Sequence, residues 1–435
     1  MPLRLRTADP AFEAAFAALV DGKREAAVDV SRDVRTIIGE VVARGDEALI
    51  ELTRRFDGVA LSAATLRVGA AEIDHALRTI DPSVRDALER AASRITAFHE
   101  RQRPPDLAWT DGEGVGLGLR WRPVDSVGLY VPGGTAAYPS SVLMNALPAR
   151  IAGVPRLVMV VPAQGGVLDP QVLAAAAIAG VDEIYRIGGA QAVAALAYGT
   201  RTVPSVDKIV GPGNAWVAEA KRQVFGRVGI DMIAGPSEIL IVADGAQDPA
   251  WIAADLLSQA EHDEVAQAIL ITDDDRLAGR VARALEAQLA DLPRRAVAAA
   301  SWRDHGAIIV VGDLAREAPA LVDRIAPEHL ELMVGEPERL AAAIRHAGSI
   351  FLGACTPEVI GDYTGGPNHV LPTGRTARFA SGLSVFDFLK RTTLLRCDRA
   401  AFERLAPTAE RLARAEGLEA HARAIRIRLH ASAGG

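Results

Sequence analysis

A carboxylate and an imidazole stand side by side in Ala326-Pro327-Glu328-His329-Leu330, at the mouth of an expected strand. Histidine changes its charge close to neutral pH, and a neighbouring carboxylate can exchange protons with a substrate or with water. We therefore predict that Glu328 and His329 form an acid-base pair.

A second group of polar side chains has the composition of a metal site. Gln259 and His262 lie three positions apart at the end of an expected helix, so their side chains share one face. Together with Asp362 and His421 they make a set of nitrogen and oxygen ligands that suits Zn²⁺. No spacing rule joins these separate segments. On the residues alone, a helix end whose polar groups face water remains the alternative.

Two further stretches combine acids with histidine. The segment from Gly361 to His369 is too rich in glycine to be regular structure, and a long ordered loop of this kind is more often functional. The segment Glu416-Gly417-Leu418-Glu419-Ala420-His421 falls in an expected helical region, where its charged residues can also be solvated surface.

Three glycine-containing loops lie beside expected strands. Two of them follow strands, Gly188-Gly189-Ala190-Gln191 and Gly211-Pro212-Gly213-Asn214, and Ala234-Gly235-Pro236-Ser237 precedes another. Ligands of open α/β sheets bind in such loops, and glycine lets the backbone approach a ligand closely. None of the loops matches the dinucleotide pattern G-x-G-x-x-G, so NAD binding does not follow from glycine spacing alone.

The elements that carry these loops predict an α/β protein. Short apolar strands alternate with helices, which is typical of parallel sheets covered by helices, and a second run of this kind begins at Glu238. The predicted strands of the two units are 157–161, 183–187, 208–210, 239–242, 269–272, 308–311, 330–334 and 350–352. Residues 1 to about 105 are predicted to be helical and 115–131 to form paired strands. Strands are expected to end before Phe386, and a small helical C-terminal element follows.

The composition is that of an ordinary globular protein with more than one domain. The chain has 435 residues, 49% of them apolar and 24% charged, and a net charge of −7 without a basic cluster. Nucleic acid and membranes are therefore not expected as partners. The first residues lack the apolar stretch of a signal sequence, and Cys355 and Cys397 form no disulfide pattern. We expect a cytoplasmic protein.

The chain resembles the histidinol dehydrogenase family over nearly its whole length. The resemblance rests on segments that occur in order along the sequence: Tyr130-Val131-Pro132-Gly133-Gly134, Gly188-Gly189-Ala190-Gln191-Ala192, Gly211-Pro212-Gly213-Asn214, Gly235-Pro236-Ser237-Glu238, Gln259-Ala260-Glu261-His262-Asp263, Pro327-Glu328-His329-Leu330, Gly361-Asp362-Tyr363, Gly366-Pro367-Asn368-His369 and Glu416-Gly417-Leu418-Glu419-Ala420-His421. At no position where the family carries catalytic or metal-binding groups does this chain depart from the pattern.

This resemblance implies a fold of two tandem incomplete Rossmann-like units with parallel sheets, plus helical N-terminal and small helical C-terminal elements. The implied domains are an N-terminal helical segment (1–25), a first Rossmann-like domain (26–129 with 237–381), a second one with the NAD-binding loops (130–236), and a C-terminal helical domain that contacts the partner subunit (382–435).

The resemblance also implies the roles of individual residues. One Zn²⁺ per subunit would be held by Gln259, His262, Asp362 and His421. NAD would be contacted by Tyr130, Gln191 and Asn214. L-histidinol would be contacted by Ser237, Gln259, His262, Glu328, Asp362, His369, Glu416 and His421. Family members are homodimers with shared active sites, so Glu416 and His421 would serve the neighbouring chain.

The implied activity is a zinc-dependent, two-step oxidation of L-histidinol through L-histidinal to L-histidine with NAD, the last steps of histidine biosynthesis. His329 would take the hydroxyl proton in the first step, and Glu328 would activate water in the second. Three alternatives were weighed: a dehydrogenase of the same family acting on another amino or sulfonated alcohol, a zinc hydrolase, and a metal-binding scaffold without catalysis. Ser237, His369 and Glu416 suit a cationic substrate that bears an imidazole, which disfavours the first alternative.

Overall fold

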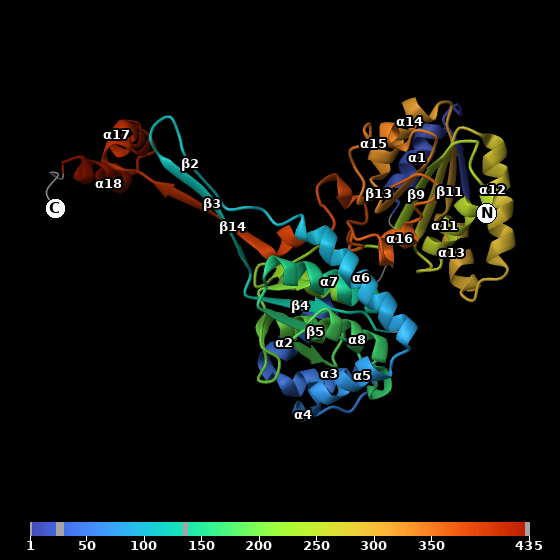
Figure 1. The fold of residues 1–435 in the computed structure, drawn as a ribbon, viewed down its shortest axis with the longest axis horizontal. Helices are drawn as coiled ribbons and strands as arrows, with labels where there is room; N and C mark the ends of the chain where they lie inside the picture. The colour runs from blue at the N-terminus through green and yellow to red at the C-terminus, as the bar shows by residue number, and fades with distance from the viewer. Residues whose placement is uncertain (1, 23–29, 134–137, 431–435) are drawn as a thin grey trace. The chain divides into compact units, whose positions relative to one another are not determined.

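The computed structural model describes residues 2–22, 30–133 and 138–430 (Figure 1). These residues form two compact units, one made of 1–102 and 125–388 and the other of 103–124 and 389–435. The predicted domain border at residues 25 and 26 and the last residue of the Tyr130–Gly134 motif lie outside the described residues.

The first unit contains a six-stranded sheet in which every pairing is parallel. Its strands in spatial order are β1 (Leu3–Arg6), β11 (Ala307–Val310), β10 (Gln267–Thr272), β9 (Glu238–Ala243), β12 (His329–Met333) and β13 (Ser349–Leu352). Five of these strands confirm the prediction to within one or two residues. The prediction that residues 1 to about 105 are helical was wrong at the edge strand β1, whose four residues of alternating Leu and Arg are too short to define a period.

Helices cover both faces of this sheet, so its central strands are apolar on both sides. In β9, Ile239 and Ile241 pack on one face against α11 (Pro249–Ala260), α12 (Asp275–Leu289) and α13 (Arg295–His305). On the other face, Leu240 and Val242 belong to the core formed with α1 (Phe12–Asp21), α14 (Leu314–Ile325) and α15 (Pro337–Ala341).

The same unit contains a second, five-stranded parallel sheet. Its strands in spatial order are β6 (Glu183–Tyr185), β5 (Arg156–Val160), β4 (Ser126–Tyr130), β7 (Lys208–Val210) and β8 (Gly229–Ile230). The accompanying helices are α2 (Ser31–Arg44), α3 (Asp46–Asp57), α4 (Ala63–Leu66), α5 (Ala70–Thr79), α6 (Pro82–Glu100), α7 (Pro139–Ala152), α8 (Pro170–Ile178), α9 (Gly189–Tyr198) and α10 (Ala215–Val224).

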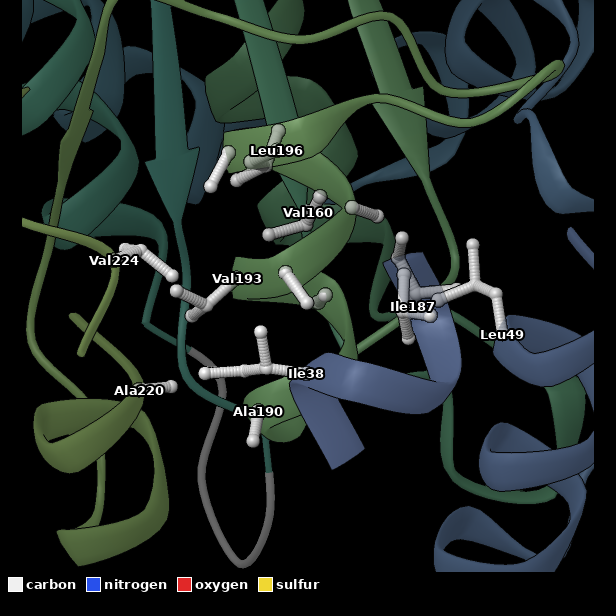
Figure 2. Close-up of a cluster of buried hydrophobic side chains, with 14 of the residues drawn as sticks. Ile38, Leu49, Val160, Ile187, Ala190, Val193, Leu196, Ala220 and Val224 are labelled. Atoms are coloured by element: carbon white, nitrogen blue, oxygen red, sulfur yellow. The ribbon is translucent and has the colours of Figure 1, made fainter. Parts of the chain in front are cut away.

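Figure 2 shows the apolar core on one face of this second sheet. Val160 of β5 meets Val193 and Leu196 of α9, and Ile38 of α2 and Val224 of α10 complete the cluster. Two parallel sheets with helices on their faces confirm the predicted α/β class of two tandem units. The predicted domain borders stay predictions.

The second unit consists of a three-stranded antiparallel sheet and two helices. Its elements are β2 (Leu107–Thr110), β3 (Gly116–Pro123), β14 (Leu389–Arg396), α17 (Arg399–Ala415) and α18 (Glu419–His430). The expectation that strands end before Phe386 was wrong: β14 is largely polar and exposed, so it has no apolar run to mark it. The expected pairing within 115–131 was also wrong, since β3 pairs with β14 and β2 while β4 belongs to the five-stranded sheet.

Within the described part of the chain, no helix combines the length and the apolar character that crossing a membrane requires.

Candidate active site

Some predicted site residues of the first unit follow the carboxyl ends of strands, and others precede the amino ends of strands. Gln191 and Asn214 come just after β6 and β7, at the carboxyl ends where ligands of open sheets bind. Ser237 and Glu328 instead immediately precede β9 and β12. Glu328 and His329, the predicted acid-base pair, therefore lie at the amino end of β12, just after Pro327 and the left-handed Ala326 (φ +48°).

The first residue of β9 holds Glu328 and His329 together. The backbone nitrogen of Glu238 donates to Glu328 Oε2 at 2.9 Å, and its carbonyl oxygen lies 2.9 Å from His329 Nδ1. Because β9 and β12 are paired in register from His329 and Ile239 onward, the sheet fixes both side chains. Glu328 is 6% exposed and His329 is 4% exposed, so water has little access to either residue.

The contact with Glu238 also fixes the proton on the His329 ring. A carbonyl oxygen only accepts, so Nδ1 must carry hydrogen and donate, which leaves Nε2 of the neutral ring as a proton acceptor. Burial, helped by the nearby His262 and His369 rings, lowers the pKa of His329 to about 3. His329 is therefore neutral near pH 7, with Nε2 unprotonated.

A short helix, α16 (Glu358–Tyr363), brings two carboxylates to this ring. Glu358 Oε1 lies 3.4 Å from His329 Nδ1, and Asp362 Oδ1 lies 3.7 Å from His329 Nε2. The two acids are four residues apart, so one face of the helix carries both. Glu331 Oε1 accepts from the backbone nitrogen of Glu358 at 2.6 Å, which ties the start of α16 to β12.

Gln259 reaches the same group from the last turn of α11. Gln259 is fully buried. In the orientation that satisfies its amide, the side-chain nitrogen lies 3.2 Å from each of Glu358 Oε1, the Glu238 carbonyl oxygen and His329 Nδ1. His262 follows in the turn after α11, where its backbone nitrogen donates to the Gln259 carbonyl at 3.1 Å. The end of α11 thus brings Gln259 to the cluster, and His262 lies in the turn that follows the helix.

The cluster has the chemistry of a site for a divalent cation. Ligand atoms of His329, Glu358 and Asp362 lie within 4.8 Å of one another. His329 Nε2 and Glu358 Oε2 are buried without a hydrogen-bond partner among the described residues. Burial raises the pKa of Asp362 to about 7, and burial and the repulsion of Asp362 raise the pKa of Glu358 well above its usual range. Nitrogen and oxygen donors of this kind fit Zn²⁺.

This electrostatic arrangement predicts how the metal-free protein responds to pH. Asp362 and Glu358 have higher pKa values in the folded state than in the unfolded state, so the folded state keeps protons that the unfolded state has lost. The histidines of the unfolded state are about half protonated at pH 6.5 and mostly neutral above about pH 7, so the acids dominate over most of the range from pH 6.5 to 8. We expect the stability of chelator-treated protein to fall from pH 6.5 to 8, by roughly 1.4 kcal/mol per pH unit for each retained proton.

Urea unfolding at several pH values checks this expectation. The decline should be smaller in Asp362→Asn, which removes one of the titrating acids, and Asp304→Asn is a matched control because Asp304 is exposed. A stability that rises between pH 6.5 and 8 in metal-free protein would contradict the assignment.

The residues predicted to contact NAD gather at the five-stranded sheet. The Tyr130 hydroxyl accepts from the Gly189 backbone nitrogen at 3.0 Å, and burial raises the pKa of Tyr130 to about 12, so the phenol stays neutral. Gln191 is 1% exposed, and among the described residues its Nε2 has no hydrogen-bond partner. Asn214 Oδ1 accepts from the nitrogens of the first turn of α10 at 3.1 and 3.2 Å.

The remaining predicted residues divide between the two units. Ser237 precedes Glu238, and His369 Nδ1 lies 3.0 Å from the Asp362 carbonyl, so both adjoin the cluster. Glu416 ends α17, and His421 lies in the first turn of α18; both belong to the second unit and are exposed. The structure therefore brings Gln259, His262, Glu328, His329, Asp362 and His369 together in the first unit.

Sequence reasoning missed Glu358 and Glu331. The spacing of Glu358 to Asp362, four residues in a segment that opens with Pro357, is the signal that could have identified it as a partner on one helical face. Glu331 is two residues after His329, which places both side chains on one face of β12. Its sequence context gives no sign that it ties down another helix.

Comparison with known proteins gives a consistent result. The histidinol dehydrogenase family model matches residues 21–429. The chain is 65% identical to the histidinol dehydrogenase of Rhodospirillum rubrum and 63% identical to that of Cereibacter sphaeroides, each over 99% of both chains. The crystal structure of histidinol dehydrogenase from Elizabethkingia anophelis is 35% identical and superposes with a TM-score of 0.94 over 98% of both chains.

Proposed function

Because the chain belongs to the histidinol dehydrogenase family, we propose that it oxidises L-histidinol through L-histidinal to L-histidine at the cluster around His329, with NAD as the oxidant. The observation that carries this proposal is the fixed, neutral His329 ring, whose Nε2 has no hydrogen-bond partner among the described residues and lies 3.7 Å from Asp362 Oδ1. An alcohol oxidation needs such a base, because the hydroxyl proton must leave as hydride departs from the same carbon.

The two neighbouring residues would act in different steps. His329 Nε2 takes the hydroxyl proton in the first oxidation. Glu328, held at Oε2 by the Glu238 backbone nitrogen, then removes a proton from the water that adds to the aldehyde. NAD supplies the acceptor for the hydride lost in each oxidation. Glu328 Oε2 lies 3.8 Å from His329 Nδ1. The two side chains are therefore close enough to act on one bound substrate.

We propose that Gln259, His262 and Asp362 of one chain, with His421, hold one Zn²⁺. When bound, the metal would orient the substrate through its amino and imidazole nitrogens. The buried carboxylates of Glu358 and Asp362, which could hold a metal ion together with His329, support a cation at this place. Glu358 lies against Gln259 and would orient that ligand, as residues behind a metal site commonly do.

The proposed cofactor contacts are Tyr130, Gln191 and Asn214. The carboxyl ends of β4, β6 and β7 lead into their loops, and parallel strands end at the same edge of a sheet. Gln191 Nε2 is buried and has no hydrogen-bond partner among the described residues, so it could donate to a bound nucleotide.

We further propose that the protein is a homodimer in which Glu416 and His421 complete the site of the neighbouring chain, where Glu416, His369 and Ser237 contact the substrate. The second unit exposes large apolar side chains, among them Leu395 at 73%, Leu412 at 60% and Ile427 at 58%. Apolar surface of this kind is expected where subunits meet.

The proposal is tested by following NADH formation with zinc-loaded protein. L-histidinol should give NADH and L-histidine, whereas an amino alcohol without the imidazole and a sulfonated alcohol should give rates lower by about two orders of magnitude or more, because unpaired polar groups in the site reject them. A faster reaction with either substitute would identify a different substrate. Hydrolytic activity without any NADH would point to a zinc hydrolase.

A further inference from the structure

A buried ion pair lies beside the five-stranded sheet, outside the cluster around His329. Lys221 of α10 and Asp231, which follows β8, form this pair with side chains that are only 3% and 1% exposed. Removing both charges from water is costly, and a buried pair is often no more stabilising than apolar side chains of the same size. We therefore infer that the pair has a role other than stabilising the fold.

Both partners bind the backbone of one residue, Gly211. Lys221 Nζ donates to the Gly211 carbonyl oxygen at 3.0 Å, and Asp231 Oδ2 accepts from the Gly211 nitrogen at 2.8 Å. The two polar groups of this peptide unit are thus satisfied by an ammonium and a carboxylate that also neutralise each other. Charge-assisted hydrogen bonds of this kind are stronger and more directional than neutral ones.

Gly211 needs such partners because it leaves the sheet. It directly follows β7 and has a φ of +114°, a conformation that side chains rarely allow. A Cβ atom at this position would lie 2.1 Å from the Tyr130 carbonyl oxygen, so the backbone passes directly against the end of β4. Sheet hydrogen bonds end at Val210, and a buried peptide beyond them requires other partners.

The Lys221–Asp231 pair thus holds the start of the loop Gly211-Pro212-Gly213-Asn214. Beyond it, Asn214 caps α10, and a Cβ atom on Gly213 would lie 2.4 Å from Val217 Cγ1. Lys221 belongs to α10, which follows the loop, and Asp231 directly follows β8. Two separate segments therefore hold the loop.

We propose that Lys221 and Asp231 are positioning residues for the dinucleotide: they fix Gly211, and with it the distance between the Tyr130 loop and the Asn214 loop across which NAD binds. This inference rests on the proposed contacts of Tyr130 and Asn214 with NAD. It assigns no contact with the nucleotide to the ion pair itself.

The test compares two double variants with the full-length zinc-loaded protein. Lys221→Met with Asp231→Leu removes both anchors and both charges, and Lys221→Met with Asp231→Asn keeps an oxygen that can accept from the Gly211 nitrogen. We expect the first to raise the KM for NAD about tenfold or more, with the KM for L-histidinol changed less than about twofold, and the second to raise the KM for NAD less. NADH binding followed by fluorescence should weaken in the same order.

The matched control is Arg222→Met, which breaks an exposed ion pair with Glu219 on the same helix and should leave both KM values unchanged. An unchanged KM for NAD in a folded double variant would overturn the proposal. Failure of both double variants to fold would overturn it as well, since the pair would then serve the fold. If the unmodified protein forms no NADH from L-histidinol, the proposed function fails instead.

Discussion

His329→Ala is expected to lower kcat for L-histidinol oxidation by about three orders of magnitude, the loss typical of removing a well-placed general base. The ring is neutral, its Nδ1 donates to the Glu238 carbonyl oxygen, and its buried Nε2 is the atom that would accept the proton. Steady-state kinetics checks the loss, and zinc content should remain close to one per subunit if the ring is a base.

Zinc content separates two roles for this ring, because His329 also lies within the group of possible ligands with Glu358 and Asp362. Loss of zinc together with activity in His329→Ala would show that His329 binds the metal. His75→Ala is the matched control, since His75 is exposed on α5 and should change neither quantity.

His421→Ala is expected to lose zinc and nearly all activity as a pure protein, and to regain activity when mixed with His329→Ala under conditions that exchange subunits. In a mixed dimer one site receives an intact His329 from one chain and an intact His421 from the other. Random exchange would make half of the dimers mixed with one good site each, so about a quarter of the original activity should return.

The companion mixture of His262→Ala and His329→Ala is the control for that result. Both positions belong to the first unit of the same chain, so every site in every dimer lacks one of the two residues. No activity should return. Recovery in this control, or none in the first mixture, would contradict a site shared between subunits in the proposed way.

The sequence predicts the parallel sheets well because their strands are buried on both faces and therefore read as uninterrupted apolar runs, as in Ile239 to Val242. It fails at β14, whose residues are mostly exposed, and at β1, which is too short to show a period. Tertiary pairing with β3 and β11, which lie far away in the sequence, makes these segments strands.

The candidate site shows the same division. Residue types and local spacing identified Gln259 with His262 and Glu328 with His329, since each pair is close in the sequence. Residue chemistry suggested Asp362 and His421 as further metal ligands, and the family resemblance supported that grouping and added His369 and Glu416. The roles of Glu238, Glu331 and Glu358 depend on contacts made across the sheet and from α16, and only the folded chain shows these contacts.

The central claim is that one site carries out two successive oxidations with His329 and Glu328 in separate steps. The most direct measurement is the ratio of NADH to L-histidine formed by zinc-loaded protein at complete conversion of limiting L-histidinol, together with an aldehyde trap in the solution. Two successive oxidations require about two NADH per L-histidine, with little aldehyde reaching the trap. One NADH per molecule of L-histidinol consumed, with the aldehyde recovered in the trap, would contradict the account.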